Sequence, residues 1–145
     1  MIKHLSILIA EDNPGDVFLM KRILSKLFFE HTIAIANDGE EVLDYLYKSI
    51  SAGETHTRPH FILLDLNLPK IDGREVLQRI KQHEILKTIP VIVFSSSQAA
   101  KDITGVYNLY ANCYVVKPYD LDEYNKVLEN VCTFWAKTVM LPEVD

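Results

Sequence analysis

Six side chains suited to holding a cation or a phosphoryl group stand at or just after the ends of apolar runs. In chain order they are Glu11, Asp12, Asp65, Asn67, Ser95 and Lys117. Carboxylates brought together repel one another at neutral pH and need a cation, and a set of oxygen ligands favours Mg²⁺. A carboxylate can also attack phosphorus to give an acyl phosphate, whose oxygens a hydroxyl and an ammonium can contact. Together these groups predict phosphoryl transfer by positioning and charge neutralisation.

Five short apolar runs bounded by turn residues predict the strands that would bring these side chains together. The expected strands are 5–10, 32–36, 61–64, 90–94 and 113–116. Helices are expected from apolar spacing at 17–27, 40–50, 74–83, 103–110 and 121–135. This alternation indicates a parallel sheet covered on both faces, and the length favours a flavodoxin-like, doubly wound α/β fold with strand order 2-1-3-4-5. The ends of its strands would converge on one edge of the sheet.

The bulk composition limits the class of protein and its partners. The chain has 145 residues, which fits one domain, and 48% of them are hydrophobic. A net charge of −5 and the lack of a Lys/Arg cluster argue against a nucleic-acid partner. No apolar run approaches the roughly 18 residues of a membrane span, and the N-terminus lacks signal-peptide organisation. Cys113 and Cys132 lie in apolar segments without CxxC spacing, so we expect buried, reduced thiols in a cytoplasmic protein.

The polar residues at the strand ends, taken in order, resemble the receiver domain of two-component response regulators. The residues that carry the resemblance are Glu11-Asp12, Asp65 in ILLDLNLP, Asp72-Gly73, Ser95 in VIVFSSS, and Lys117-Pro118. Ser95 stands 30 positions after Asp65 (95 − 65) and Lys117 stands 52 after it (117 − 65). Each motif alone is weak, but the ordered set is specific. The resemblance covers roughly residues 5–134 and implies a CheY-like fold.

The resemblance implies a role for each acid. Asp65 would be the phosphoacceptor, taking a phosphoryl group from the phosphohistidine of a histidine kinase to give a 4-aspartylphosphate. Asp12 and Asp65 would bind Mg²⁺. Asn67 would add its backbone carbonyl, and Glu11 would act mainly through water. The chain would then be a signalling phosphoacceptor and not an enzyme in the usual sense, because it catalyses only its own phosphorylation and dephosphorylation.

The resemblance also implies roles for residues after the fourth and fifth strands. Ser95 and Lys117 would contact the phosphoryl group. Tyr114 would be a switch residue that moves inward with Ser95 on activation, and Ser97 would tune how fast the acyl phosphate hydrolyses. The peptide bond between Lys117 and Pro118 is usually cis in this family.

Three further stretches resemble single-domain regulators that are partnered with bacterial and cyanobacterial phytochromes. They are the polar segment 51–60, the run DLNLPKIDGREVL and the ending TFWAKTVMLP. Residues 1–145 would then form a single receiver domain with a short extension, 137–145, and no output domain, so the output would be protein binding or onward phosphotransfer. A homodimer would use the face of the fourth helix, fifth strand and fifth helix. Aromatic residues available there are Tyr107, Tyr110, Tyr119, Phe134 and Trp135.

The site residues also have ordinary structural explanations when they are taken singly. An acid after a strand, such as Asp65, is more often a solvated strand end than a nucleophile. Glu11 and Asp12 fit loop acids that precede a helix, and Lys117 alone would be a surface lysine. The convergence of these groups favours the functional interpretation.

Some assignments stay open at the level of sequence. Ser96 and Ser97 could replace Ser95, which only the spacing selects. Tyr114 suits the core as well as a switch. Trp135 continues the inward stripe of the last predicted helix, which begins at Leu121, so it fits the core better than an interface.

Three other functions compete with the receiver interpretation. The first is a Mg²⁺-dependent phosphatase of the haloacid dehalogenase type, which carries a second Asp two positions after the nucleophile; Asn67 stands there and cannot transfer a proton. The second is an interaction module that is never phosphorylated, but such modules lose the acids or the lysine that this chain keeps. The third is a flavin-binding protein, which the acidic sheet edge disfavours.

Overall fold

A single parallel sheet forms the centre of the computed structural model, which describes residues 4–27, 30–51 and 57–143. Its strands are β1 (His4–Ala10), β2 (Glu30–Ala36), β3 (Phe61–Leu64), β4 (Val91–Ser95) and β5 (Cys113–Val116). They lie in the order β2-β1-β3-β4-β5, and every neighbouring pair is parallel. The predicted doubly wound α/β fold with order 2-1-3-4-5 is therefore confirmed, with β2 starting two residues earlier than expected.

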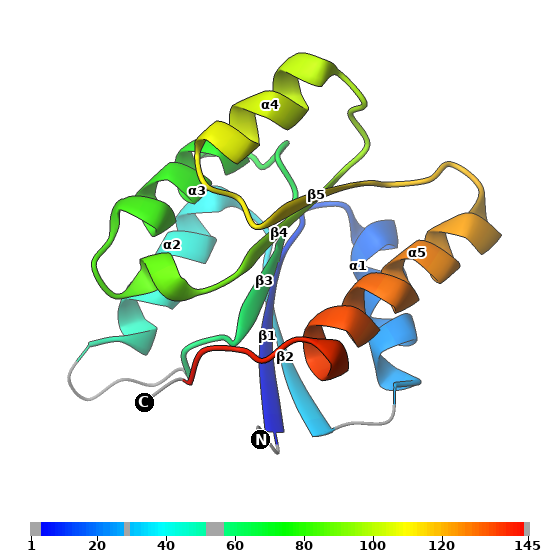
Figure 1. Ribbon diagram of the computed structural model, residues 1–145, viewed down its shortest axis with the longest axis horizontal. Helices are drawn as coiled ribbons and strands as arrows, with labels where there is room; N and C mark the ends of the chain where they lie inside the picture. The colour runs from blue at the N-terminus through cyan, green and yellow to red at the C-terminus, as the bar shows by residue number, and fades with distance from the viewer. Residues whose placement is uncertain (1–3, 28–29, 52–56, 144–145) are drawn as a thin grey trace.

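Helices cover both faces of the sheet. They are α1 (Pro14–Ser25), α2 (Gly39–Ser49), α3 (Gly73–Gln82), α4 (Ala100–Asn108) and α5 (Leu121–Thr133), with short turns η1 (Leu86–Thr88) and η2 (Phe134–Thr138). Figure 1 shows α1 and α5 on one face and α2, α3 and α4 on the other. None of the helices in the described ranges is both long and apolar enough to cross a lipid bilayer.

The core has two layers, because the side chains of each strand alternate between the two faces of the sheet. Successive side chains of a strand point to opposite faces, so Ile7 and Ile9 join the apolar cluster under α1 and α5, whereas Leu8 and Ala10 join the cluster under α2 and α3. The central strand β3 is buried along its whole length. A sheet buried on both faces presents polar side chains only where its strands end.

Asparagine or aspartate side chains cap the N-termini of four helices. Asn13 caps α1, Asp38 caps α2, Asp72 caps α3 and Asp120 caps α5, each by accepting a hydrogen bond from a backbone N–H in the first turn. In the cap of α1, the donor to Asn13 Oδ1 is the backbone N–H of Asp16, at 3.1 Å, and the Asp16 side chain takes no part. Its carboxylate is therefore available for other partners.

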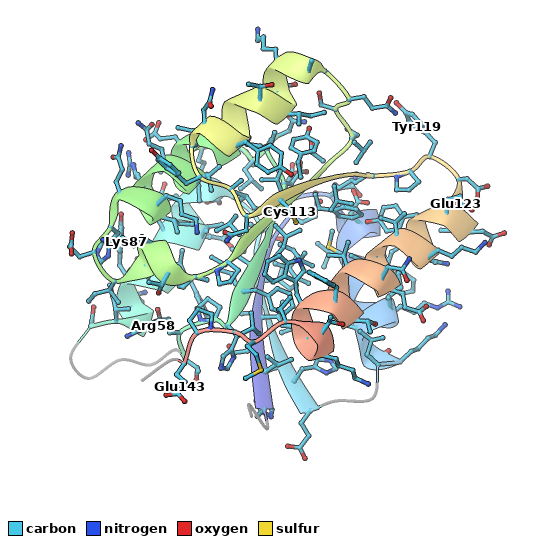
Figure 2. The ribbon with its side chains drawn as sticks, in the orientation of Figure 1. Arg58, Lys87, Cys113, Tyr119, Glu123 and Glu143 are labelled. Carbon is cyan, nitrogen blue, oxygen red and sulfur yellow. The ribbon has the colours of Figure 1, made fainter. Side chains whose placement is uncertain are left out.

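The last two helices differ from the sequence pattern. In α4 only Val106 is buried. The helix ends at Asn108, so Tyr110, which was expected inside it, lies in the following turn at φ 69° with 75% of its surface exposed. Leu121 was expected to face inward, which is wrong: it is 56% exposed in the first turn of α5. Trp135 is partly buried against the cluster under α1 and α5, as expected. Figure 2 labels Cys113, the first residue of the edge strand β5, and Tyr119, which lies at the periphery and is exposed.

The backbone between Lys117 and Pro118 corrects one expectation of the family resemblance. No peptide bond in the described ranges is cis, so the expected cis bond is wrong here. Cys113 and Cys132 are free thiols, as predicted; Cys132 is fully buried and Cys113 partly so.

Candidate functional site

The predicted site residues meet at the carboxyl edge of the sheet. The parallel hydrogen-bond ladder runs one step past the strands: Asp65 donates its N–H to Ala10 O at 3.0 Å, and Lys117 donates its N–H to Ser95 O at 2.8 Å. Glu11 directly follows β1, so it is held beside the residue that follows β3. The crevice between neighbouring strands at this edge is where ligands bind in such folds.

Three carboxylates form a compact oxygen cluster at this edge. Glu11, Asp12 and Asp65 each offer an oxygen, and these oxygens all lie within 4.8 Å of one another. Glu11 and Asp65 are buried, with 1% and 8% of their surfaces exposed, whereas Asp12 is open to solvent. Hard divalent cations prefer such all-oxygen sets and keep several waters, which the open side would supply. The residues therefore fit a divalent cation.

The Lys117 ammonium lies among the acids. Its Nζ is 2.5 Å from Glu11 Oε1, 3.2 Å from Asp16 Oδ2 and 3.4 Å from Asp65 Oδ2. Burial alone would lower the pKa of Lys117, but the hydrogen bond to Glu11 and the surrounding carboxylates raise it above its ordinary value. The ammonium therefore stays charged and can donate to a phosphoryl oxygen in place of a carboxylate.

The protonation state of Glu11 changes with pH near neutrality. Burial raises its pKa to about 7, against the lowering effect of the hydrogen bond from Lys117. The neighbouring charge of Asp65 adds to the increase. A cation at this site would favour the ionised form, so cation binding is coupled to loss of this proton.

We expect the cation-free protein to lose stability as pH rises from about 4.5 to about 7. The folded protein holds the Glu11 proton in this window and the unfolded chain does not, so the free energy of unfolding falls with pH by about 1–3 kcal/mol. Urea unfolding across the window, in a chelator, measures this slope. Glu11→Gln should flatten it, and a slope unchanged in that variant would contradict the assignment.

The loop after β3 shapes the surroundings of Asp65. The Asn67 side chain is exposed, and its backbone N–H donates to Asp65 Oδ1 at 3.3 Å. Gly73, at the start of α3, donates its N–H to Leu66 O at 2.9 Å. These contacts fix the Asp65 carboxylate with one oxygen toward the loop and the other toward Lys117.

The three serines after β4 differ in their surroundings. Ser95 is buried as the last residue of β4, and its Oγ accepts from Ser97 N at 3.4 Å. Ser96 is exposed. Ser97 Oγ donates to Asp102 Oδ2 at 2.6 Å in the first turn of α4. Of the three serines, Ser95 alone is buried and stands at the end of a strand, which is the position that the spacing selects.

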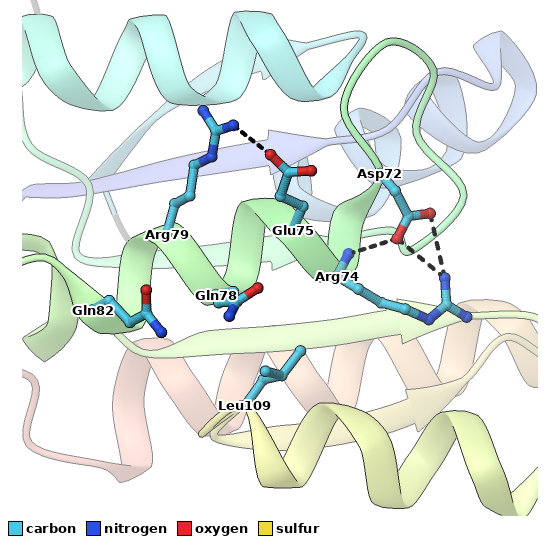
Figure 3. A pocket seen from close by; sticks show the side chains of 7 residues that line it. All are labelled: Asp72, Arg74, Glu75, Gln78, Arg79, Gln82 and Leu109. Carbon is cyan, nitrogen blue, oxygen red and sulfur yellow. Dashed lines mark hydrogen bonds and ion pairs between the residues drawn. The ribbon is translucent and has the colours of Figure 1, made fainter.

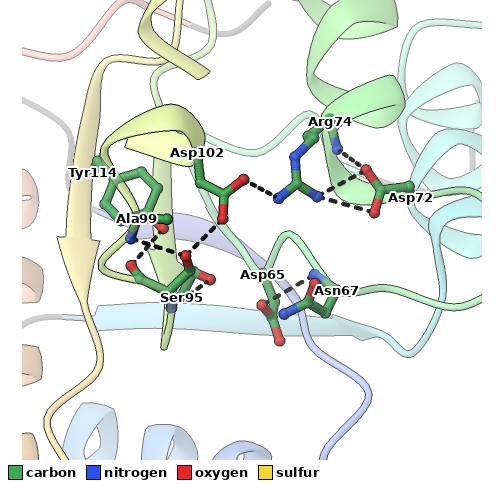
Figure 4. A network of polar contacts seen from close by, with 9 residues as sticks. Asp65, Asn67, Asp72, Arg74, Ser95, Ala99, Asp102 and Tyr114 are labelled. Atoms are coloured by element: carbon green, nitrogen blue, oxygen red, sulfur yellow. Dashed lines mark hydrogen bonds and ion pairs between the residues drawn. The ribbon is translucent and has the colours of Figure 1, made fainter. Parts of the chain in front are cut away.

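A polar chain connects this loop to α3 and β5. Asp102 also forms an ion pair with Arg74 at 2.9 Å, and Arg74 in turn contacts Asp72 (Figure 4). Tyr114 is half-buried, and its hydroxyl donates to Ser97 O at 2.8 Å. Tyr114 packs against the core, and its hydroxyl also contacts the loop that follows Ser95, so its switch role stays a prediction beside its role in the core.

Two residues near the acids were not singled out by the sequence. Asp16 contacts Lys117, and Tyr124 on α5 donates its hydroxyl to Asp16 Oδ1 at 2.7 Å. Asp16 belongs to the same acidic turn as Glu11 and Asp12, and this was the signal available for it. Tyr124 had none, because its part depends on how α5 packs beside α1.

A surface pocket lies apart from the carboxylate cluster, between α3 and the end of α4 (Figure 3). Its charges are already matched: Arg79 pairs with Glu75, and Arg74 pairs with Asp72 and Asp102. The rest of its lining is Gln78, Gln82 and Leu109, and none of the three clustered carboxylates lines it.

Comparison with known proteins agrees with this arrangement. Residues 7–129 match the family model "Response regulator receiver domain". The response regulator Rcp1 of Synechocystis sp. is 40% identical over 136 residues, spanning 94% of this chain and 92% of Rcp1. The crystal structure of the Mn²⁺-bound form of Rcp1 has a TM-score of 0.90 at 38% identity, with 96% of this chain and 99% of that chain covered.

Two further solved structures are closely similar. The phosphorylated cyanobacterial phytochrome response regulator RcpA gives a TM-score of 0.91 at 39% identity, covering 97% of this chain and 99% of that chain. The bacteriophytochrome response regulator AtBRR gives a TM-score of 0.70 at 36% identity, with 98% and 100% covered.

Proposed function

Because this chain belongs to the family of response regulator receiver domains, we propose that it accepts a phosphoryl group on Asp65 from a histidine kinase in a Mg²⁺-dependent phosphorelay. One observation carries the proposal. The buried Asp65 carboxylate lies between a lysine ammonium, 3.4 Å away, and two further carboxylates whose oxygens are within 4.8 Å. A structural ion pair would not need this excess of negative charge, whereas a nucleophile that works with a cation does.

The residues of the site divide the work of the transfer. An Asp65 oxygen attacks phosphorus, the bond from phosphorus to the histidine nitrogen breaks, and an acyl phosphate forms. Glu11, Asp12, Asp65 and the backbone carbonyl of Asn67 would hold Mg²⁺, which neutralises charge on the phosphoryl oxygens when bound. Lys117 transfers a hydrogen bond from Asp65 Oδ2 to a phosphoryl oxygen, and Ser95 donates to another.

The same residues favour a lasting acyl phosphate over rapid turnover. Asn67 stands beside Asp65 with an exposed amide, which can neither give nor take a proton at neutral pH. No acid at that position activates water for hydrolysis. The group would therefore persist long enough to act as a signal, with Ser95 and Tyr114 reporting it to the α4–β5 side through the Ser97 carbonyl.

The proposed kinase partner is inferred from the proteins that this chain resembles. Rcp1 is a response regulator, RcpA is a phytochrome response regulator and AtBRR is a bacteriophytochrome response regulator. These relatives support a phytochrome-type histidine kinase as the donor. Residues 1–145 would act as one receiver domain that signals by phosphorylation-dependent protein binding, in the cytoplasm, where free thiols such as Cys113 and Cys132 persist.

A homodimer through α4, β5 and α5 is a separate part of the proposal. Exposed aromatic residues on or beside these elements support it, namely Tyr107, Tyr110, Tyr119 and Phe134, whereas Trp135 is partly buried. Exposed aromatic side chains of this kind are enriched where proteins bind one another. Sedimentation with and without beryllofluoride tests this part, and a monomer under both conditions would overturn it.

The donor is tested by phosphotransfer from a panel of autophosphorylated histidine kinases that includes phytochrome-type kinases. We expect label to pass to this chain fastest from a phytochrome-type kinase, at least about tenfold faster than from the others, since cognate pairs differ by interface energies of a few kcal/mol. The measurement is loss of label from the kinase with time. Equal rates from all kinases, or no transfer, would contradict the partner assignment.

A further inference from the structure

Asp16 is an acid of the site that lies outside the cation cluster. It stands in the first turn of α1, with 20% of its side chain exposed, and its Oδ2 is 3.2 Å from Lys117 Nζ. Its other oxygen, Oδ1, accepts the Tyr124 hydroxyl at 2.7 Å. Each oxygen of Asp16 therefore has a separate partner, one on the loop after β5 and one on α5.

Tyr124 is well placed to fix the orientation of Asp16. Only 5% of its surface is exposed, and its ring packs edge-on against Phe94 with centroids 5.4 Å apart. Lys117 Nζ lies 5.7 Å from the centroid of the same Phe94 ring. Burial, together with the hydrogen bond to Asp16, raises the pKa of Tyr124, so the hydroxyl keeps its proton and remains a donor.

The three partners of Lys117 are not equivalent. An ammonium has three N–H groups, and here they face Glu11, Asp65 and Asp16. Glu11 and Asp65 are also members of the oxygen cluster that fits a divalent cation. Every hydrogen bond that Lys117 makes to Glu11 or Asp65 competes with the cation for their oxygens. A hydrogen bond to Asp16 does not compete in this way.

We propose that Asp16 and Tyr124 are positioning residues: Tyr124 orients Asp16, and Asp16 holds the Lys117 ammonium so that Glu11 and Asp65 can take the cation. This inference rests on the proposed function, because it assigns a role in preparing the same site for phosphoryl transfer. It distinguishes Asp16 from the other acids, which serve the cation itself. Without the Asp16 contact, the Lys117 ammonium would keep only its contacts with Glu11 and Asp65 and would compete more strongly with the cation for their oxygens.

The test is a double-mutant cycle on cation affinity, with Mn²⁺ as the probe and free Mn²⁺ counted by electron paramagnetic resonance. Tyr124→Phe removes one oxygen and no charge, and we expect it to weaken Mn²⁺ binding about two- to fivefold, a coupling usual within one hydrogen-bond network. Lys117→Met removes the competitor and should tighten Mn²⁺ binding. In the Lys117→Met background, Tyr124→Phe should leave Mn²⁺ affinity unchanged.

The controls separate positioning from stability. Tyr47→Phe, at an exposed tyrosine on α2, should leave Mn²⁺ affinity unchanged. Asp16→Asn provides a second variant whose effect on Mn²⁺ should also shrink when Lys117 is absent. Thermal melts identify any variant that fails to fold.

Two outcomes overturn the inference. One is a Mn²⁺ affinity that Tyr124→Phe leaves unchanged or tightens, and the other is an equal weakening with and without Lys117. Neither outcome depends on phosphorylation, so the inference can fail while Asp65 still accepts phosphate. Conversely, a site that binds Mn²⁺ as expected but takes no phosphoryl group would overturn the proposed function alone.

Discussion

Asp65→Asn is expected to abolish phosphorylation of this chain by acetyl phosphate and Mg²⁺. The amide nitrogen and oxygen are poor nucleophiles toward phosphorus, and the variant also removes one of the three carboxylates that fit the cation. We expect the rate to fall by at least about 10²-fold, the scale of losing a covalent nucleophile. Intact-protein mass spectrometry over time measures the rate as the gain of one phosphoryl group.

A matched control uses the same chemical change at an unrelated acid. Asp44 lies on α2 and forms an exposed ion pair with Lys48 at 3.0 Å. Asp44→Asn should be phosphorylated at the wild-type rate. If Asp65→Asn and Asp44→Asn take up phosphate equally, the assignment of the acceptor is wrong.

Gly73→Ala is expected to destabilise the fold by about 3 kcal/mol, the upper end of overpacking costs. A Cβ at Gly73 would lie 2.4 Å from Asp65 O and 2.7 Å from Leu66 Cα. Both are backbone atoms of the loop that carries the acceptor, so they can move only if α3 and the loop separate. Urea unfolding measures the loss, and the phosphorylation rate of the folded fraction should fall because Asp65 is displaced.

Gly105→Ala is the opposite case and serves as its control. Gly105 lies inside α4, and a Cβ there would meet nothing within 4 Å. We expect a gain of about 0.5–1 kcal/mol from the better helix propensity of alanine. Similar changes in stability for the two variants would mean that the start of α3 does not press on the Asp65 loop.

The sheet and the main site residues could be predicted because one rule connects them. Apolar runs identify the strands, alternation with helices makes the strands parallel, and parallel strands end at one edge. Glu11, Asp65 and Lys117 follow three different strands, so their convergence follows from strand order alone. The contacts of Lys117 with Glu11 and Asp65 agree with that reasoning.

Other features could not be predicted because they depend on packing between elements distant in sequence. Asp16 contacts Tyr124 across 108 positions, and this contact exists only because α1 and α5 lie side by side. Arg74 contacts Asp102 across 28 positions, between two helices whose rotation no local pattern specifies. Leu121 is exposed because it begins α5 directly after its cap, Asp120, where apolar spacing does not yet determine burial.

The most direct test of the central claim identifies the phosphorylated residue in the wild-type chain. Phosphorylate the chain with acetyl phosphate and Mg²⁺, reduce the acyl phosphate with borohydride, digest the product, and sequence the modified peptide by mass spectrometry. The account predicts a single reduced residue at position 65, in the peptide that contains ILLDLNLP. Modification at Asp12, at a histidine or at several acids, with position 65 unmodified, would contradict it.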